Sequence, residues 1–248
     1  MRGAIRLPPS GRVSQPDRDS RKMGRLGLVR DSDILAYYQL DGGITDSATA
    51  GLYDLSVQTG VERYSYYDNF RMLSLDGSSI MRHNASPAAL ELTAAMSLHA
   101  LVVPAAQATG YFVTHDGTSD AAADNILYSL LMQTGGGKSQ LEYFIEYSGG
   151  TNEFADVDCW PAIGVPLFLT LTRPTAATSV GFYVNGILFG TVVSLNAPTS
   201  GTAGQFRIGG SASGTNMYTG LIGEVQLLDT ELTAAQVLED ARRVMPWL

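Results

Sequence analysis

The sequence has little of the chemistry that cross-links a protein or anchors it in a membrane. Cys159 is the single cysteine among 248 residues, which excludes an internal disulfide and a disulfide-rich secreted scaffold. No apolar run approaches the roughly eighteen residues that a membrane-spanning helix needs, so we expect no membrane insertion. The opening residues also lack the apolar core of a signal peptide, and we expect a soluble product made in the cytoplasm.

Charged side chains are scarce as well, at 16% of the residues, whereas hydrophobic residues make up 45% and glycine occupies 27 positions. This mixture is typical of short strands joined by glycine turns and not of long solvated helices. A chain of this length is within the range that β-sandwiches reach as one unit, so we expect a single core. The composition therefore favours an all-β fold.

The few charges are unevenly distributed along the chain. Residues 1–30 carry eight basic side chains against Asp17 and Asp19, a net +6, so the total of −8 leaves −14 for the remainder. Prolines and glycines interrupt this segment, and we interpret residues 1–33 as an extended arm that binds an anionic surface. That surface is either a neighbouring subunit or the acidic body of the same chain. The candidate binding residues of the arm are Arg2, Arg6, Arg12, Arg18, Arg21, Lys22, Arg25 and Arg30.

Short extended segments separated by turn residues follow from Ile34 onward. Their spacing is typical of a β-sandwich and not of alternating strands and helices. Asn185-Gly186 is the strongest hairpin signal, because a type I′ turn needs positive φ at both central positions. The later candidate strands are 79–82, 90–103, 111–114, 126–134, 140–147, 167–173, 180–184, 187–193, 205–208 and 221–228.

One helix is expected near the end of the chain. Thr233 and Gln236 have the spacing of a capping box, and apolar residues recur after them at helical intervals. Arg242 and Arg243 suit the negative end of the helix dipole, and Pro246 stops the helix. We therefore predict three parts: the arm over 1–33, a sandwich over 34–229, and a helix within 230–248 that packs on the sandwich.

Three segments resemble the laminin-G-like, concanavalin-A-like lectin jelly roll found in phage structural proteins and adhesive modules. AYYQLDGGITDSATAGLYDLS is similar to the opening pattern of that family, FYVNGILFG to its hairpin, and IGG…YTGLIGEVQLLDTELTAAQV to its closing pattern. The resemblance spans roughly residues 36 to 240 and implies an antiparallel jelly-roll β-sandwich. Gly223 departs from it by replacing the usual aspartate, and Leu167 stands near the place of a frequent tryptophan, for which Trp160 is a shifted candidate.

The chain lacks the carboxylate pattern of glycosidases with this fold. No E-x-D-x-x-E triplet occurs. Glu142 and Glu146 would be about 13 Å apart on a strand, too far for paired carboxylate catalysis, and Asp156 and Asp158 are expected in a loop. The histidines show no metal-ligand spacing, no G-x-S-x-G elbow is present, and His99 is expected to be packed or hydrogen-bonded. We therefore predict a protein that is not an enzyme.

Two groups of side chains remain as candidate binding sites. The loop HDGTSDAAADN offers Asp116, Asp120 and Asp124 as oxygen ligands for calcium, the one cofactor considered, although an unliganded polar loop has the same composition. Tyr64 and Tyr66 alternate onto one strand face, where they would stack on a sugar ring or pack in the core or an interface.

The preferred function at this point is a non-catalytic virion structural protein, such as a phage capsid decoration, fibre or tail component. In this reading the arm binds other subunits of the assembly and the jelly roll is displayed. The alternative is a carbohydrate-binding or adhesion module that recognises cell-surface glycans. Sequence-specific nucleic-acid binding is not expected, because the arm has no interleaved aromatic residues and no nucleic-acid-binding module follows it.

Overall fold

A computed structural model gives the fold of the main body of the chain. Contacts divide the chain into two units, Met1–Asp31 and Ser32–Leu248, and every described residue belongs to the second. The basic arm, Asp120, Asp124 and Trp160 lie outside the described residues. The structure describes residues 34–48, 51–68, 70–85, 87–117, 126–135, 138–147, 151–159, 162–176, 178–193, 195–196 and 204–245.

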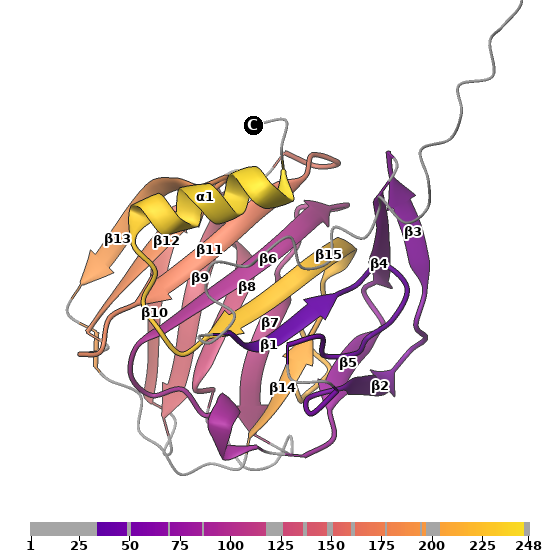
Figure 1. Cartoon of the computed structure of the whole chain (residues 1–248), viewed down its shortest axis with the longest axis horizontal. Helices are drawn as coiled ribbons and strands as arrows, with labels where there is room; N and C mark the ends of the chain where they lie inside the picture. The colour runs from indigo at the N-terminus through magenta and orange to yellow at the C-terminus, as the bar shows by residue number, and fades with distance from the viewer. Residues whose placement is uncertain are drawn as a thin grey trace, which may run out of the picture. The chain divides into compact units, whose positions relative to one another are not determined.

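The described residues form two antiparallel β-sheets and one α-helix (Figure 1), which confirms the predicted jelly-roll sandwich. The first sheet, sheet A, has the order β13-β12-β11-β6-β15-β4-β3, and β1 pairs with β15 beside this path. These strands are β1 Ile34–Gln39, β3 Tyr64–Tyr67, β4 Phe70–Asp76, β6 Met96–Pro104, β11 Leu167–Arg173, β12 Ser179–Val184, β13 Ile187–Val193 and β15 Thr219–Leu228.

The second sheet, sheet B, has the order β10-β9-β8-β7-β14-β5-β2. Its strands are β2 Leu55–Thr59, β5 Ile80–His83, β7 Gly110–Gly117, β8 Tyr128–Gly135, β9 Lys138–Tyr147, β10 Thr151–Asp158 and β14 Gly204–Ile208. A short 3₁₀ helix, Ala88–Leu90, precedes β6, so the predicted strand 90–103 begins later than expected.

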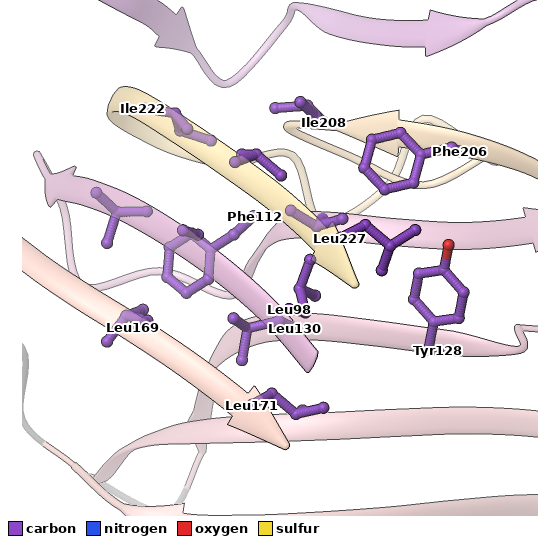
Figure 2. Packing of buried hydrophobic residues seen from close by; sticks show 14 of the residues in the cluster. Leu98, Phe112, Tyr128, Leu130, Leu169, Leu171, Phe206, Ile208, Ile222 and Leu227 are labelled. Carbon is purple, nitrogen blue, oxygen red and sulfur yellow. The ribbon is translucent and has the colours of Figure 1, made fainter. Parts of the chain in front are cut away.

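The inner faces of the two sheets meet in one hydrophobic core (Figure 2). Alternate residues of β14 and β15 point into it, and the ring of Phe206 stacks on Tyr38 with the ring centroids 5.5 Å apart. Strand alternation then places the intervening residues on the outer faces of the sheets. Each sheet therefore has an inner face that forms the core and an outer face that points away from it.

The middle of sheet A explains the departure at Gly223. The register of β15 against β6 shifts between Ile222 and Glu224, so Gly223 occupies a bulge. A Cβ at this position would lie 2.8 Å from the Met72 Cε atom and 3.0 Å from Leu101, closer than packed carbons approach. Glycine is present because the neighbouring side chains fill the space that an aspartate would need.

The Asn185-Gly186 hairpin forms as predicted between β12 and β13. Both central residues have positive φ, 54° and 81°. The Asn185 side chain also accepts a hydrogen bond from the Phe168 backbone N–H at 3.0 Å. A Cβ on Gly186 would lie 2.9 Å from Ala241 and Leu238, so glycine also allows the helix to rest directly on the turn.

The predicted helix is α1, Ala234–Val244, and it lies over β11, β12 and β13 on the outer face of sheet A (Figure 1). Its capping box is present, since the Thr233 hydroxyl accepts from the Gln236 N–H and the Gln236 side chain accepts from the Thr233 N–H. Ala241 and Met245 pack against Phe168 of the sheet. These contacts confirm a helix packed on the sandwich.

One prediction about local structure was wrong, and one strand was missed. Asp156 and Asp158 lie on β10 and not in a loop, because the segment after Gly150 pairs along its whole length with β9. Strand β4 was not predicted either, although its hairpin with β3 is a regular antiparallel pair. Polar and glycine residues before β10 suggested a loop there, and long-range pairing overrode this local preference.

Candidate functional site

The outer face of sheet B carries a continuous row of side chains from strands that are distant in sequence. Cross-strand register and the hydrogen bonds between Ser129 and the Phe144 backbone connect its members. No described helix covers this face, because α1 lies on sheet A. We call the set the cross-strand row, and it runs Ser56, Arg82, Arg207, Thr114, Ser129, Phe144 and Phe154 across β2, β5, β14, β7, β8, β9 and β10.

Aromatic rings form one end of the cross-strand row. Phe154 is 59% exposed, although large apolar side chains are normally buried. Its neighbour Ala155 is buried in the core, so strand alternation turns Phe154 outward. Phe144 is its cross-strand partner and is half-buried. This end of the row presents an aromatic surface to solvent at the edge of the sheet.

Beside the aromatic end lies a pair of carboxyl groups. Glu142 and Asp156 are directly opposed partners on β9 and β10. Burial, together with repulsion from Asp156, raises the pKa of Glu142 to about 7. Glu142 therefore keeps its proton up to about pH 7, above the ordinary range of a carboxylic acid, and in that protonated form it can donate a hydrogen bond.

Two glutamine amides are bonded to these carboxyl groups. The Gln140 amide donates to Asp156 at 2.7 Å and to Asp158 at 3.2 Å. With its nitrogen turned toward β9, the Gln133 amide donates to Glu142 Oε1 at 2.9 Å. Amides and carboxyl groups supply both donors and acceptors, which is the set that hydroxyl-rich ligands require.

The other end of the cross-strand row is basic and more deeply buried. The Arg207 guanidinium forms an ion pair with Asp116 and is only 1% exposed. It also donates to Gln58 at 2.8 Å and to Gln205 at 2.9 Å. The second Asp116 carboxylate oxygen accepts from the Ala212 N–H at 2.6 Å. Every oxygen of this carboxylate is thus already used inside the protein.

This arrangement bears on the predicted calcium ligands. Asp116 is held by Arg207 and a backbone N–H, whereas Asp120 and Asp124 lie outside the described residues. Among the residues that the structure describes, no group of three acidic, histidine or cysteine side chains is arranged to hold a metal ion. Calcium binding by this loop therefore stays a prediction.

The predicted tyrosines lie away from the cross-strand row, on the edge strand β3 of sheet A. Tyr64 is half-buried against the core and donates a hydrogen bond to Glu62 at 2.5 Å, while Tyr66 is 66% exposed. The Arg71 guanidinium lies 4.5 Å from the centre of the Tyr64 ring, and Arg71 is the cross-strand partner of Tyr66. The two tyrosines share one face as expected, and a role in sugar binding remains a prediction.

His99 lies on the outer face of sheet A beneath α1. Its Nδ1 is 2.7 Å from the Thr170 hydroxyl and its Nε2 is 3.5 Å from Asp240, and its ring stacks on Phe168. The series hydroxyl, imidazole and carboxylate resembles a catalytic triad in order, but all three side chains are buried under the helix. The structure thus gives His99 the packed, hydrogen-bonded position that its apolar neighbours predict.

Sequence reasoning missed the cross-strand row because its neighbours come from different parts of the chain. Arg82 and Arg207 are 125 positions apart, and Glu142 faces Asp156 only through the register of two strands. The carboxylate pairs considered from the sequence, Glu142 with Glu146 and Asp156 with Asp158, each lie within one segment, whereas the structure opposes Glu142 and Asp156 across two strands. Strand assignment of β10 would have placed Phe154, Asp156 and Asp158 on one face by simple alternation.

The fold and this face define a class: a lectin-type jelly-roll sandwich with a polar and aromatic outer sheet face. The chain belongs to the concanavalin A-like lectin/glucanase superfamily, whose family model matches residues 76–238. No curated protein sequence matches the chain. In the described part of the chain, no helix has the length and apolar character that crossing a membrane requires.

Several solved structures share the fold. Domain 4 of a GH43 extracellular arabinanase from Geobacillus stearothermophilus, in complex with arabinotriose, is 19% identical with a TM-score of 0.62, covering 84% of this chain and 98% of that one. The binding domain of Paraclostridial Mosquitocidal Protein 1 is 9% identical with a TM-score of 0.65, covering 86% of this chain. The receptor-binding domain of botulinum neurotoxin C/D mosaic serotype is 11% identical with a TM-score of 0.62, again covering 86%.

The chain spans about half the length of the two toxin domains, 53% and 51%, and nearly the whole arabinanase domain. Two of these neighbours are binding domains and the third is a domain of an enzyme. At these identities the likeness establishes the jelly-roll fold and no further property of this chain.

Proposed function

We propose that this protein is a carbohydrate-binding module that holds an oligosaccharide on the outer face of sheet B. The observation that carries the proposal is the exposed Phe154 ring beside the amide and carboxyl groups of Gln140, Glu142 and Asp156. Sugar rings have apolar C–H faces that pack on an aromatic ring, and hydroxyl groups that exchange hydrogen bonds with amides and carboxyl groups. The superfamily and the arabinotriose complex of one structural neighbour support the same class of ligand.

We further propose that the face binds saccharides without cleaving them. A glycosidase needs one carboxyl group as acid and a second one as base or nucleophile, placed on either side of the scissile bond. Glu142 and Asp156 lie side by side on neighbouring strands, and a glutamine amide is bonded to each carboxyl group. This arrangement favours recognition of hydroxyl groups over attack on an anomeric carbon.

Binding is tested with the full chain against a panel of oligosaccharides that includes arabinotriose, read out by titration calorimetry. The Phe154→Ala variant should bind its best ligand at least about tenfold more weakly, because it removes the stacking surface. Phe189→Ala is the matched control: Phe189 is 51% exposed and lies on β13 of the other sheet, so its loss should not change the affinity.

Two results would count against the proposed function. The first is equal binding by the wild type and Phe154→Ala, which would place the ligand elsewhere. The second is release of reducing sugar by the wild type that disappears in the Glu142→Gln or Asp156→Asn variant, which would identify a hydrolase.

A second candidate function is a structural role in a virion or another assembly, and charge is the observation that favours it. The +6 of residues 1–30 against −14 for the rest of the chain suits an arm that binds an acidic surface. Strand β13 adds a sheet edge without a single charged residue, and Ile187, Leu188 and Val193 are exposed on it. We propose that the arm binds neighbouring subunits, and this role is compatible with saccharide binding by the body.

Deletion of residues 1–30 tests the assembly role. The truncated protein should keep the thermal stability of the full chain and lose its association, and the loss should be greater at low salt than at high salt because salt screens charge contacts. Sedimentation of both proteins at two salt concentrations measures this. Equal association of the truncated and full-length proteins would rule out the arm as the binding element.

A further inference from the structure

The strand orders of the two sheets end in four strands that differ in length and charge. Sheet A ends in β3 and β13, and sheet B ends in β2 and β10. β2 and β3 are short, with five and four residues. β10 has eight residues and includes Glu153, Asp156 and Asp158, whereas β13 has seven residues and carries no charge. Shortness and charge both protect an edge strand from pairing with another chain, and β13 has neither.

The absence of charge extends well beyond β13. No aspartate, glutamate, lysine, arginine or histidine occurs between Arg173 and Arg207, although charged residues make up 16% of the chain. This segment contains β12 and β13, the hairpin that ends sheet A (Figure 1). The chain after residue 30 carries −14, the total of −8 minus the +6 of residues 1–30. Two copies of this acidic body repel one another, and an uncharged edge lets them approach with the least repulsion.

Four apolar side chains of β13 are exposed. Ile187 is 70% exposed, Leu188 50%, Phe189 51% and Val193 64%. At these fractions they present on the order of 400 Å² of apolar surface, about half of the roughly 800 Å² that each partner buries in a standard interface. The backbone of the strand adds to this area. Apolar side chains gathered in this way on one strand mark an interaction surface.

The regular part of this edge is Gly190–Val193. The register of β13 against β12 shifts between Phe182 and Tyr183, which leaves Phe189 as an extra residue. Beyond it, Gly190–Val193 pair in sequence with the residues of β12, and among the described strands β13 pairs with β12 alone. Alternate N–H and C=O groups of such a strand point away from its one partner, where a further strand can pair with them.

The acidic strand β10 lies next to β13, but its described carboxylates point away from it. Val157 of β10 faces Gly190 so closely that a Cβ on Gly190 would lie 2.5 Å from the Val157 Cγ1 atom. Strand alternation then places Asp156 and Asp158 on the opposite face of β10, which is the outer face of sheet B. These carboxylates act on a copy at the β13 edge only from a distance, where salt screens them.

We propose that β13 pairs with β13 of a second copy of this chain. Antiparallel pairing of a strand with its own copy has two-fold symmetry, so every contact is made twice and sheet A continues from one copy into the other. Each copy has a single β13, so the assembly closes as a dimer. The exposed apolar side chains of this edge are then withdrawn from water in both copies.

The symmetry of this pairing orients the two sandwiches. The two-fold axis of an antiparallel strand pair is perpendicular to the sheet, so the outer faces of both copies of sheet B point in the same direction. The dimer would present two saccharide sites to one surface, which raises the strength of attachment to a glycan-covered surface. This consequence rests on the proposed function, whereas the pairing itself does not.

Sedimentation equilibrium of the full chain over a range of concentrations tests the pairing. The wild type should be a dimer that dissociates on dilution. Val193→Lys places a charge on the edge that the dimer buries, so the dissociation constant should rise at least about a hundredfold. Circular dichroism should show an unchanged fold, because the Val193 side chain is exposed in the single chain.

Leu52→Lys is the matched control. Leu52 is 62% exposed and precedes β2, at the opposite end of sheet B from β10. The substitution adds the same charge to an equally exposed apolar side chain and changes the net charge by the same amount. It should leave the dissociation constant nearly unchanged, so a difference between the two variants isolates the β13 edge.

Salt and truncation separate this pairing from association through the arm. Salt screens the repulsion between the acidic bodies and should tighten the β13 dimer, whereas a contact made by the basic arm weakens. Protein without residues 1–30 should lose the association that the arm provides and still sediment as a dimer. Dissociation of the truncated protein into monomers would contradict the pairing.

Hydrogen exchange gives a second measurement that needs no variant. The N–H groups of β13 that point away from β12 should exchange more slowly at high protein concentration than at low concentration. This result decides the matter if Val193→Lys fails to fold. Exchange of β13 that is independent of concentration would overturn the proposal.

Three sedimentation results would also overturn the proposal. The first is a wild type that stays monomeric up to about 1 mM, where even weak dimers form. The second is equal dimerisation of Val193→Lys and Leu52→Lys, and the third is growth into open-ended polymers instead of a closed dimer. Saccharide binding by a monomeric wild type would leave the proposed function intact, so the two proposals fail separately.

Discussion

The two outer faces of the sandwich carry similar polar residues and differ in what covers them. On sheet A, His99, Glu224 and Gln226 lie on the outer surface, close to Asp240 and Arg243 of α1. On sheet B, Arg82, Glu142 and Asp156 lie on the outer surface, and no described helix covers them. We call the first the closed face and the second the open face.

The difference between the two faces separates polar groups that stabilise the fold from polar groups that can bind a ligand. On the closed face the polar groups bond to one another: Gln226 donates to Glu224 at 3.0 Å, and Tyr37 donates to it at 3.2 Å. On the open face the same kinds of groups form a row, with Phe154 exposed at the β10 edge and Arg207, Thr114 and Ser129 buried in the middle. Polar groups in the buried middle of both faces stabilise the fold, and the exposed groups at the β10 edge of sheet B are available to a ligand.

The largest expected effect comes from breaking the closed face. Ala241→Asp would place a carboxylate against Phe168 and the hairpin turn at a site with 0% exposure. We expect a loss of about 4 kcal/mol in the free energy of unfolding, because an unpaired charge is forced into an apolar contact. Urea unfolding followed by circular dichroism measures it. A loss below 1 kcal/mol would mean that α1 is not part of the cooperative fold.

The next prediction separates the two arginines of the open face. Arg207→Gln leaves Asp116 buried without its ion-pair partner and should cost about 3 kcal/mol of stability. Arg82→Gln should stay within about 0.5 kcal/mol of the wild type, because among the described residues none forms an ion pair with Arg82 and its Nε makes no hydrogen bond. Equal losses in the two variants would show that Arg82 has a structural role and would remove the contrast.

The third prediction uses pH to compare one carboxyl group on each face. Burial raises the pKa of Glu224 to about 7, against 4.5 in an unfolded chain, so the folded state retains a proton that the unfolded state releases between these values. Stability from Glu224 is therefore present below pH 4.5 and is lost as the pH rises through 7. We expect a fall of about 2–3 kcal/mol between pH 5 and 8, which Glu224→Gln should abolish.

Glu142→Gln on the open face should flatten the same pH profile as well, because burial and the neighbouring Asp156 raise the pKa of Glu142 to about 7. His115 gives the opposite trend below pH 6.5, since burial lowers the pKa of its ring to about 4 and protonation then disfavours folding. The comparison of variants with the wild type at each pH removes this common contribution. An unchanged pH profile in either variant would contradict the raised pKa of that carboxyl group.

The smallest expected effect on stability belongs to the exposed aromatic ring. Phe154→Ala should change the free energy of unfolding by no more than about 0.5 kcal/mol, because the ring is 59% exposed. Phe168→Ala on the closed face should cost about 3 kcal/mol, because its ring is 1% exposed and packs against the helix. Thermal unfolding of the two variants measures the difference between these two losses of stability.

Much of the fold was predictable because its signals are local. The Asn185-Gly186 turn needs only two residues that tolerate positive φ, and the α1 capping box needs only Thr233 and Gln236. Strands such as β11 and β13 were predicted with their observed bounds, because continuous apolar and β-branched residues mark them.

The candidate site was not predictable in the same way. Register decides that Arg82 faces Arg207 and that Glu142 faces Asp156, and no local pattern encodes which strands become neighbours. Local composition even pointed the wrong way at β10, where charged residues and preceding glycines suggested a loop. Strand alternation correctly predicted that Tyr64 and Tyr66 share one face. It could not predict that they lie on an edge strand or that Arg71 lies beside them.

The pairing of β1 with β15 has a consequence for the order in which the protein can assemble. β15 lies in the middle of sheet A, between β6 on one side and β4 and β1 on the other, and β14 is likewise central in sheet B. Strands from the beginning and the end of the sandwich therefore meet, which gives a high contact order and predicts slow folding. During synthesis neither sheet can become continuous before residues 204–228 have emerged from the ribosome. Until then the earlier strands have unpaired edges and are prone to aggregation.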